Sequence, residues 1–467
     1  MPAITNARSK AAPAEDRTIS GTRVLDAPRE LVWLMFERPE HLAKWWGPKG
    51  FTNTFDEFSF RPGGDWKFVM HGPDGRNYKT HQRFLELVKP ERIVMEHLST
   101  PHFETTITLE DLGGRTSVQW VNVFDSAEVR DQTVKAVNAA EGLKQNLEKL
   151  GDYVGKADLV IDRVFDAPRD LVFKAWTDPK QLAKWWGPAG FTNPVCEADA
   201  RPGGSLRIDM RDPFGTVFPM KGTFHEVVAP ERLSFTAIGA EDPAGNVLLQ
   251  THNGVTFTDE KGKTRMRLEV RVIVAAPMMA GAVAGMSAGW SGSIDKLDAL
   301  LTGKAPVAEF VISRTFEAPR DLVWKAWTEP ERMAQWFGPK GVKIVKSNND
   351  LRPGGVYHYG MQTPDGNVMW GKWTYINIAP PQLLVFVNSF SDENGGITRH
   401  PLAPTWPLEM VSAIGFRDEN GSTTVTMRWS PINATEEERA TFDKGRDGMK
   451  GGWSGTFEQL EAYLKSV

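Results

Sequence analysis

The stretch DAPRELVWLMFERPEHLAKWWGPKG, residues 26–50, decides the fold because the chain contains it three times. It returns as DAPRDLVFKAWTDPKQLAKWWGPAG at residues 166–190 and as EAPRDLVWKAWTEPERMAQWFGPKG at residues 317–341. An Arg-Pro-Gly-Gly motif follows every copy after the same number of residues, at positions 61–64, 201–204 and 352–355. This repeat is longer than the roughly 20–50 residues of a solenoid unit. We therefore predict three tandem copies of one whole domain.

The ends of the copies set the domain boundaries. Gly-Trp-Ser-Gly, at residues 289–292 and 452–455, opens a leucine-rich helical pattern, and the first copy has Leu143 where the others have Trp. We expect three domains, at residues 17–155, 156–304 and 305–467. A disordered arm, residues 1–16, precedes them, because this segment is polar and rich in Ala and Pro. The length of 467 residues agrees, since a domain holds about 100–200 residues.

Each copy reads as one strand, two short helices, six strands and a closing helix, which is an α+β domain with an antiparallel sheet. In the first copy Pro28 starts one helix and Pro39 a second, which Gly47 and Pro48 end. We predict helices near residues 29–36 and 127–150, and strands near 17–25, 78–88, 92–98, 103–110 and 116–124. The Met-, Ala- and Gly-rich segment 277–289 is expected to be a flexible connector, with a mobile lid over the domain interior as the alternative.

Alternation along the strands assigns one row of large side chains to the inner face of each sheet. The residues that we predict to line the interiors are Trp66, Phe68, Met70, Tyr78, Gln82, Phe84, His97 and Trp120 in the first copy, Leu206, Ile208, Met210, Phe218, Met220, Phe224 and Phe235 in the second, and Tyr357, Tyr359, Met361, Met369, Trp373, Tyr375, Asn388 and Trp429 in the third. Core packing alone would explain any one of them. Trp66, Leu206 and Tyr357 differ greatly in size at one equivalent position, and such variation favours the walls of three differently shaped cavities over a close-packed core.

Composition excludes several classes of function. Net charge is -4 with the charges well mixed, so no nucleic-acid partner is expected. Cys196 is the single cysteine, which rules out a disulfide within the chain and a cysteine-rich metal site. The histidines have no metal spacing, and no motif indicates a cofactor or assigns a catalytic residue. The most apolar stretch, residues 275–289, is too short for membrane insertion, and residues 1–16 lack a signal peptide's apolar run, so we expect a cytoplasmic protein.

The motifs together resemble the activator-of-heat-shock-protein-90-ATPase-like family of the START-like, or SRPBCC, superfamily. The resemblance rests on the order of Ala-Pro-Arg, Trp-Trp-Gly-Pro, Arg-Pro-Gly-Gly, Pro-Glu-Arg at 90–92 and 230–232, and the terminal Gly-Trp. The third copy departs from it at Pro380-Pro381-Gln382, and the first lacks the terminal Gly-Trp. The resemblance implies a helix-grip fold, in which a curved antiparallel sheet wraps a long C-terminal helix and leaves a cavity between them.

The function that the resemblance implies is binding of hydrophobic small molecules, in a carrier, sensor or stress-related role. A chaperone co-factor that acts through protein–protein contacts is the first alternative, because eukaryotic relatives act on a chaperone. A hydrolase, lyase or isomerase that uses one cavity is the second alternative, since a few superfamily members are enzymes and acid–base catalysis needs only one positioned histidine or carboxylate. The expected partner is a hydrophobic small molecule, with a chaperone or other protein as the alternative, and we expect a binding protein rather than an enzyme.

Overall fold

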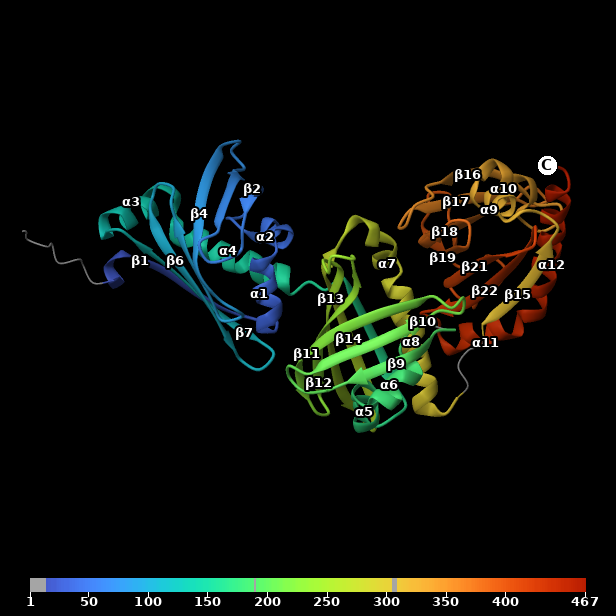
Figure 1. Ribbon diagram of the computed structural model, residues 1–467, viewed down its shortest axis with the longest axis horizontal. Coiled ribbons are helices and arrows are strands. Elements are labelled where there is room, and N and C mark those ends of the chain that lie inside the picture. The colour runs from blue at the N-terminus through green and yellow to red at the C-terminus, as the bar shows by residue number, and fades with distance from the viewer. Residues whose placement is uncertain (1–13, 189, 305–308) are drawn as a thin grey trace, which may run out of the picture. The chain divides into compact units, whose positions relative to one another are not determined.

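The computed structural model describes residues 14–188, 190–304 and 309–467. The chain divides into two compact units, residues 1–157 and residues 158–467, and the second unit contains two domains. Figure 1 shows that each of the three domains pairs one curved sheet with a long C-terminal helix. The predicted α+β architecture of tandem helix-grip domains is therefore confirmed.

The first domain follows the predicted order of elements, and the other two repeat it. Domain 1 contains η1 (Ala14–Arg17), β1 (Thr18–Leu25), α1 (Arg29–Glu37), α2 (Pro39–Trp45), β2 (Thr52–Phe58), β3 (Asp65–His71), β4 (Asn77–Val88), β5 (Arg92–His97), β6 (Phe103–Asp111), β7 (Thr116–Phe124), α3 (Ala127–Val137) and α4 (Ala139–Val154). Domain 2 contains β8 (Leu159–Phe165), α5 (Arg169–Thr177), α6 (Pro179–Trp185), β9 (Thr192–Ala198), β10 (Ser205–Arg211), β11 (Val217–Val228), β12 (Arg232–Glu241), β13 (Val247–Glu260), β14 (Lys263–Ala275), η2 (Pro277–Met279), α7 (Ala280–Ala284) and α8 (Met286–Thr302).

Domain 3 adds one short strand to this plan. It contains β15 (Phe310–Phe316), α9 (Arg320–Thr328), α10 (Pro330–Trp336), β16 (Lys343–Asn349), β17 (Val356–Gln362), β18 (Val368–Ala379), β19 (Leu383–Ser391), β20 (Ile397–Thr398), β21 (Glu409–Glu419), β22 (Ser422–Ile432), α11 (Glu436–Lys444) and α12 (Arg446–Leu464). Each sheet is antiparallel, with the first strand of the domain paired to the last, as in β1-β7-β6-β5-β4-β3-β2. The longest helix of each domain, α4, α8 or α12, lies against the curved sheet of that domain.

Repeated motifs fasten the elements in the same way in every domain. The hydroxyl of Thr116 donates to the carbonyl of Ala27, 2.7 Å away, and so ties the Asp-Ala-Pro-Arg segment to β7. The indole N–H of Trp45 donates to the carbonyl of Met35 and joins the two short helices. Equivalent bonds come from Thr264 and Trp185 in domain 2 and from Thr423 and Trp336 in domain 3. These hydrogen bonds within each domain account for the recurrence of the motifs, so no contact with a ligand is needed to explain it.

Glycine is required in the Arg-Pro-Gly-Gly turn because the chain passes very close to itself. A Cβ atom on Gly64 would lie 2.0 Å from the carbonyl oxygen of Ser59. The same clash would occur at Gly204 and Gly355, which approach Asp199 and Asp350. No residue with a side chain fits there without moving the backbone. The motif thus forms the tight turn that precedes the β3 strand and its equivalents.

Two expectations about local structure are wrong, and a third lies mostly outside the described residues. The closing helix of domain 1, predicted as one helix near residues 127–150, is two helices, because Asn138 has left-handed backbone angles (φ 50°) and ends α3. Segment 277–289, predicted to be a flexible connector, forms η2, α7 and the start of α8. Residues 1–13 of the predicted arm lie outside the described residues, whereas residues 14–17 form the 3-10 helix η1.

The glycines of segment 277–289 lower its helix propensity, but they are needed for packing. A Cβ atom on Gly281 would lie 1.9 Å from the carbonyl oxygen of Ile376 and 2.7 Å from Cβ of Pro353. The backbone of helix α7 therefore packs directly against the backbone of β18 in domain 3. Tertiary packing outweighs intrinsic propensity here, which sequence composition alone does not reveal.

Candidate functional site

The inner rows of the three sheets lie where alternation places them, between sheet and helices. Of the predicted lining residues, the buried ones are Trp66, Phe68, Gln82, Phe84, Trp120, Leu206, Ile208, Met220, Phe224, Phe235, Tyr357, Tyr359, Trp373 and Tyr375. Half-buried ones are Met70, His97, Met210, Met361, Met369, Asn388 and Trp429. Tyr78 and Phe218 lie at the strand ends, where they are 38% and 37% exposed and pack on Phe51 and Phe191. Contact of any of these residues with a ligand remains a prediction.

The interior of domain 1 is aromatic, with a polar pair in the middle of its inner row. Trp66 lies 4.7 Å from the ring of Trp46 and 4.3 Å from that of Phe68, between ring centroids. Gln82 is the direct cross-strand partner of Trp66. The indole Nε1 of Trp66 and the amide Oε1 of Gln82 are both buried and have no hydrogen-bond partner among the described residues. An unpaired donor and an unpaired acceptor therefore come from neighbouring inward-facing side chains, and each costs free energy while it remains unpaired.

His97 lies beside this pair and is neutral at physiological pH. Burial lowers the pKa of its imidazole below 6.5, against the opposing effect of hydrogen bonds to the carbonyls of Pro101 and Ser99. Because carbonyl oxygens only accept, Nδ1 carries the proton and donates to Pro101, 2.8 Å away. The ring stacks on Phe103 at 4.4 Å between centroids. His97 thus presents Nε2 as an acceptor and could orient a ligand without transferring a proton.

Domain 2 contains a buried polar residue that the sequence analysis missed. Asn253 of β13 is 1% exposed and lies on the same inner row as Val255 and Phe257. Its Nδ2 donates to Thr251 Oγ1 at 3.0 Å and to the carbonyl of Phe235 at 3.4 Å, whereas its Oδ1 has no hydrogen-bond partner among the described residues. Alternation counted back from Val255 could have found it.

Domain 3 places tyrosines in the interior instead. Tyr357 and Tyr359 stack with ring centroids 4.9 Å apart, and Tyr357 lies 5.1 Å from Trp373. Burial raises the pKa of Tyr359 and of Tyr375, so both phenols stay protonated at physiological pH. Tyr375 Oη donates to Asn349 Oδ1 at 2.9 Å. These groups are neutral donors and supply no base or nucleophile at physiological pH.

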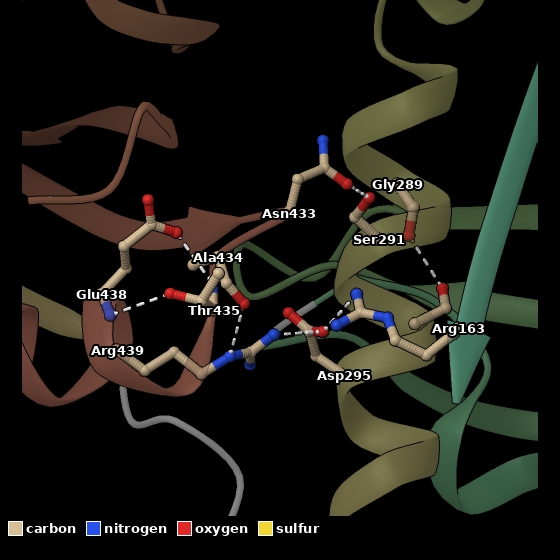
Figure 2. Close-up of polar contacts among 10 residues, drawn as sticks. Arg163, Gly289, Ser291, Asp295, Asn433, Ala434, Thr435, Glu438 and Arg439 are labelled. Atoms are coloured by element: carbon tan, nitrogen blue, oxygen red, sulfur yellow. Dashed lines mark hydrogen bonds and ion pairs between the residues drawn. The ribbon is translucent and has the colours of Figure 1, made fainter. Parts of the chain in front are cut away.

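A groove of about 430 Å³ lies at the junction of domains 2 and 3, outside the predicted interiors. Its lining comes from residues 159–163 of β8, Ser287 of α8, and residues 433–435 before α11. Figure 2 shows the polar network next to it, in which Asp295 Oδ1 accepts from Arg163 at 3.1 Å and from Arg439 at 2.5 Å.

This network joins the two domains rather than enclosing a ligand. Ser291 of α8 donates to Asn433 Oδ1, the side chain of Asp295 is 13% exposed, and the groove itself is open to solvent. An apolar molecule would stay largely hydrated in such a place, since small-molecule sites bury most of their ligand. The groove is therefore a poorer candidate than the interiors for the predicted ligand.

Two features of the described residues concern metal binding and membrane insertion. No group of three or more His, Cys, Asp or Glu side chains in the part of the chain that the structure describes could hold a metal ion. None of the helices in those ranges combines the length and apolar character needed to cross a bilayer.

Comparisons with known proteins identify the family. No curated protein matches the chain. Among solved structures, protein CV1439 from Chromobacterium violaceum is 32% identical over 30% of this chain and 98% of its own, with a TM-score of 0.27. Protein NE0264 from Nitrosomonas europaea is 28% identical over 32% and 96%, with a TM-score of 0.28. The di-domain ARO/CYC StfQ of the steffimycin biosynthetic pathway is 13% identical over 66% and 98%, with a TM-score of 0.33.

The family model for Activator of Hsp90 ATPase homolog 1-like proteins matches three segments, residues 26–155, 166–302 and 317–465. Each match falls within one predicted domain and contains the Arg-Pro-Gly-Gly turn, the closing helix and the Trp-Gly-Pro turn, which is residues 46–48 in domain 1, 186–188 in domain 2 and, as Phe-Gly-Pro, 337–339 in domain 3. With most of the chain matched, and with the fold of each third in agreement, the chain belongs to the Activator of Hsp90 ATPase homolog 1-like family, three domains of which it carries in tandem.

Proposed function

We propose that this protein binds hydrophobic small molecules in the interiors of its helix-grip domains. The family typically has a hydrophobic ligand-binding cavity at this place. The observation that carries the proposal for this chain is the set of buried polar atoms without hydrogen-bond partners on the inner rows. Among the described residues this set includes Trp66 Nε1 and Gln82 Oε1 in domain 1, Asn253 Oδ1 in domain 2 and Trp429 Nε1 in domain 3.

Unpaired buried polar atoms are unfavourable by about 1–3 kcal/mol each, and native proteins rarely leave them without reason. A ligand with a mostly apolar body and one polar group would satisfy them and bury its own apolar surface against the surrounding rings. The aromatic content of the interiors supports the same ligand class, because flat rings offer large apolar contact areas in fixed orientations.

Native mass spectrometry of the full chain as purified tests the proposal. We expect protein species that carry additional small-molecule mass, which organic extraction then removes. The emptied protein should bind 2-methoxynaphthalene, an apolar probe, saturably in isothermal titration calorimetry. The proposal fails if no small molecule accompanies the protein and the emptied chain shows no saturable binding, for instance because ordered water satisfies the unpaired atoms.

The same experiment separates the alternatives. A molecule whose mass changes during incubation with the protein would indicate the hydrolase, lyase or isomerase hypothesis. A chain with no small molecule and no probe binding would instead favour a co-factor that acts through its surface on a chaperone.

A further inference from the structure

The three interiors differ in side-chain size on the central strands β4, β5 and β6, on β3, and at the end of the edge strand β2, or on the equivalent strands of domains 2 and 3. At six equivalent positions, domain 2 has the smallest side chain of the three. In the order domain 1, 2, 3 they are Phe58, Ala198, Asn349; Phe60, Ala200, Leu351; Trp66, Leu206, Tyr357; Gln82, Gly222, Trp373; His97, Ala237, Asn388; and Phe103, Thr251, Met410. Met220 of domain 2 is larger than its counterparts, Thr80 and Gly371, but this one increase does not balance the reductions. The backbone closes in at Gly222, where a Cβ atom would lie 2.3 Å from the carbonyl oxygen of Thr236, and Leu351 of domain 3 is 39% exposed. At the other four positions, Ala198, Leu206, Ala237 and Thr251, a close-packed interior that loses this much volume has space beside its helix.

Asn253 of domain 2 has an unpaired acceptor among the described residues, whereas domains 1 and 3 have at its position a hydroxyl group that donates to a neighbouring amide. Thr105, Asn253 and Ser412 occupy one equivalent position, two residues before an inward Ile, Val or Ile. In domain 1 Thr105 donates to Asn122 Oδ1 at 2.8 Å, and in domain 3 Ser412 donates to Asn388 Oδ1 at 2.6 Å. Polar side chains at this position therefore have polar partners in domains 1 and 3.

Domain 2 lacks the equivalents of both polar partners, Asn122 of domain 1 and Asn388 of domain 3. The position of Asn122 is taken by Val270, which is the cross-strand neighbour of Asn253, and the position of Asn388 is taken by Ala237. Neither apolar side chain can donate, so Oδ1 of Asn253 has no hydrogen-bond partner in the part of the chain that the structure describes, while 1% of the residue is exposed.

The chemical character of the missing partner follows from the amide orientation. The carbonyl of Phe235 can only accept, so the Nδ2 side of Asn253 must face it, at 3.4 Å. The oxygen is then on the other side of the amide and can only accept. The group that completes this site is consequently a hydrogen-bond donor.

We propose that the interior of domain 2 binds an apolar molecule that carries one hydroxyl group, which donates to Asn253 Oδ1 while the apolar body lies beside Ala237. This inference rests on the proposed function and names the ligand class for one of the three interiors. Asn253 sets the preference for a donor, and the small side chains provide the volume.

Paired probes on the full chain test the preference. 2-Naphthol has the hydroxyl donor, and 2-methoxynaphthalene has the same ring system without it. Because one hydrogen bond contributes about 1–1.5 kcal/mol, we expect the wild-type chain to bind 2-naphthol roughly tenfold tighter in calorimetry. N253L, which keeps the approximate size and removes the acceptor, should bring the two affinities together. The matched changes T105V and S412A at the equivalent positions of domains 1 and 3 should leave the tenfold ratio unchanged.

A variant that fills the proposed space in domain 2 provides a second test. A237N introduces the residue of domain 3, whose amide reaches the diagonal position and would donate to Asn253 Oδ1 while occupying the space. We expect it to abolish 2-naphthol binding and raise the melting temperature, so it also serves if N253L does not fold. An unchanged ratio in N253L, or a ratio that collapses in S412A instead, overturns the inference while leaving the proposed function intact. If neither probe binds saturably to the wild-type chain, both fail.

Discussion

Domains 1 and 2 fill the same part of their interiors with an indole ring that enters from opposite sides. In domain 1 the ring belongs to Trp120 of strand β7 and lies 4.9 Å from Trp46, between centroids. In domain 2 it belongs to Trp290 of helix α8 and lies 5.1 Å from Trp186, the equivalent of Trp46. The element that carries the ring has changed, but the ring has the same neighbour.

The exchange is complete because the opposite position carries leucine in both domains. Helix α4 has Leu143 where α8 has Trp290, and strand β14 has Leu268 where β7 has Trp120. The volume near the Trp-Gly-Pro turn is thus conserved although its source is not, as a packed core requires. The small side chains Ala198, Leu206, Ala237 and Thr251 of domain 2 are offset only in part, by Met220, and this contrast separates core positions from those that leave space for a ligand.

The largest effect is expected where the exchange is broken. W290L removes the indole from domain 2 and leaves leucine on both sides, so we expect a loss of about 2–4 kcal/mol in the free energy of unfolding, measured by urea titration. Adding L268W returns an indole from the strand, as in domain 1, and should recover at least half of that loss. A double variant no more stable than W290L would show that the two positions do not exchange volume.

Overfilling domain 1 provides the converse test. L143W places a second indole opposite Trp120, and we expect it to destabilise the domain by about 1–3 kcal/mol. Combining it with W120L should remove most of that cost. If L143W alone is neutral, domain 1 has unfilled space near Trp46, and the contrast drawn above is wrong.

A smaller effect is expected at the contact that helix α7 makes with domain 3. Because a Cβ on Gly281 would lie 1.9 Å from the Ile376 carbonyl, G281A must push α7 away from β18, at a cost of about 1–3 kcal/mol. The matched control is G452A, also inside a helix but with no atom within 4 Å of the added Cβ. This change should stabilise by about 0.5–1 kcal/mol because alanine favours helix. Equal effects of both changes on the thermal midpoint would show that the α7 contact does not hold in solution.

The fold could be predicted from sequence because its signals are local and occur three times. The Ala-Pro-Arg helix starts, the Gly-Pro stops and the strand alternation each depend on a few neighbouring residues, and the order of the motifs supports the family resemblance, which implies the helix grip. The α3–α4 break escaped prediction because Asn138 tolerates left-handed backbone angles without demanding them. The α7 helix escaped it because the glycines that lower its propensity are required by contact with Ile376, which is distant in sequence.

The candidate site was predictable only in part. Alternation placed the inner rows correctly, since a strand residue's side follows from its neighbours. It could not show that Oδ1 of Asn253 is unpaired, because that depends on Ala237 and Val270 on two other strands. Alternation also assigned Tyr78 and Phe218 to the inner rows without showing their exposure, because it gives the face of a strand residue and not the burial at the strand's end.

The closing helices offer a third comparison, between Glu148 of α4 and Asp295 of α8. Glu148 pairs with Lys49 at 2.8 Å on an exposed surface, and Asp295 accepts from Arg163 and Arg439 in a mostly buried place. D295A leaves two guanidinium groups without their shared carboxylate, so we expect a loss of about 1–2 kcal/mol in urea titration. E148A is the matched control and should cause no measurable change, as for most exposed ion pairs. A loss of equal size in E148A would contradict the burial difference.

The smallest effect concerns the next residue on each helix, Lys149 and Lys296. Lys149 donates to the Gly47 carbonyl at 3.0 Å, and Lys296 donates to the carbonyls of Gly187 and Phe191 at 3.1 and 3.2 Å. Both ammonium groups thus hold the Trp-Gly-Pro turn against the closing helix, and in domain 3 Gln459 donates to the equivalent carbonyl. Burial lowers the pKa of Lys296 from 10.5 to about 8, and it also lowers that of Lys149.

This depressed pKa makes the stability of domain 2 depend on pH in a defined window. Between about pH 8 and 10.5 the folded chain has released the Lys296 proton and the unfolded chain has kept it, so unfolding takes up a proton and stability rises with pH. Other groups titrate in this range. The informative quantity is therefore the difference in unfolding free energy between the wild type and K296Q, in which glutamine replaces Lys296 as Gln459 does at the equivalent position of domain 3. We expect that difference to shift in favour of the wild type by about 1–2 kcal/mol from pH 7.5 to 10.5, with a smaller shift of the same sign for K149Q. A difference that stays constant across the window would mean that Lys296 keeps its charge, because its bonds to the turn carbonyls outweigh burial.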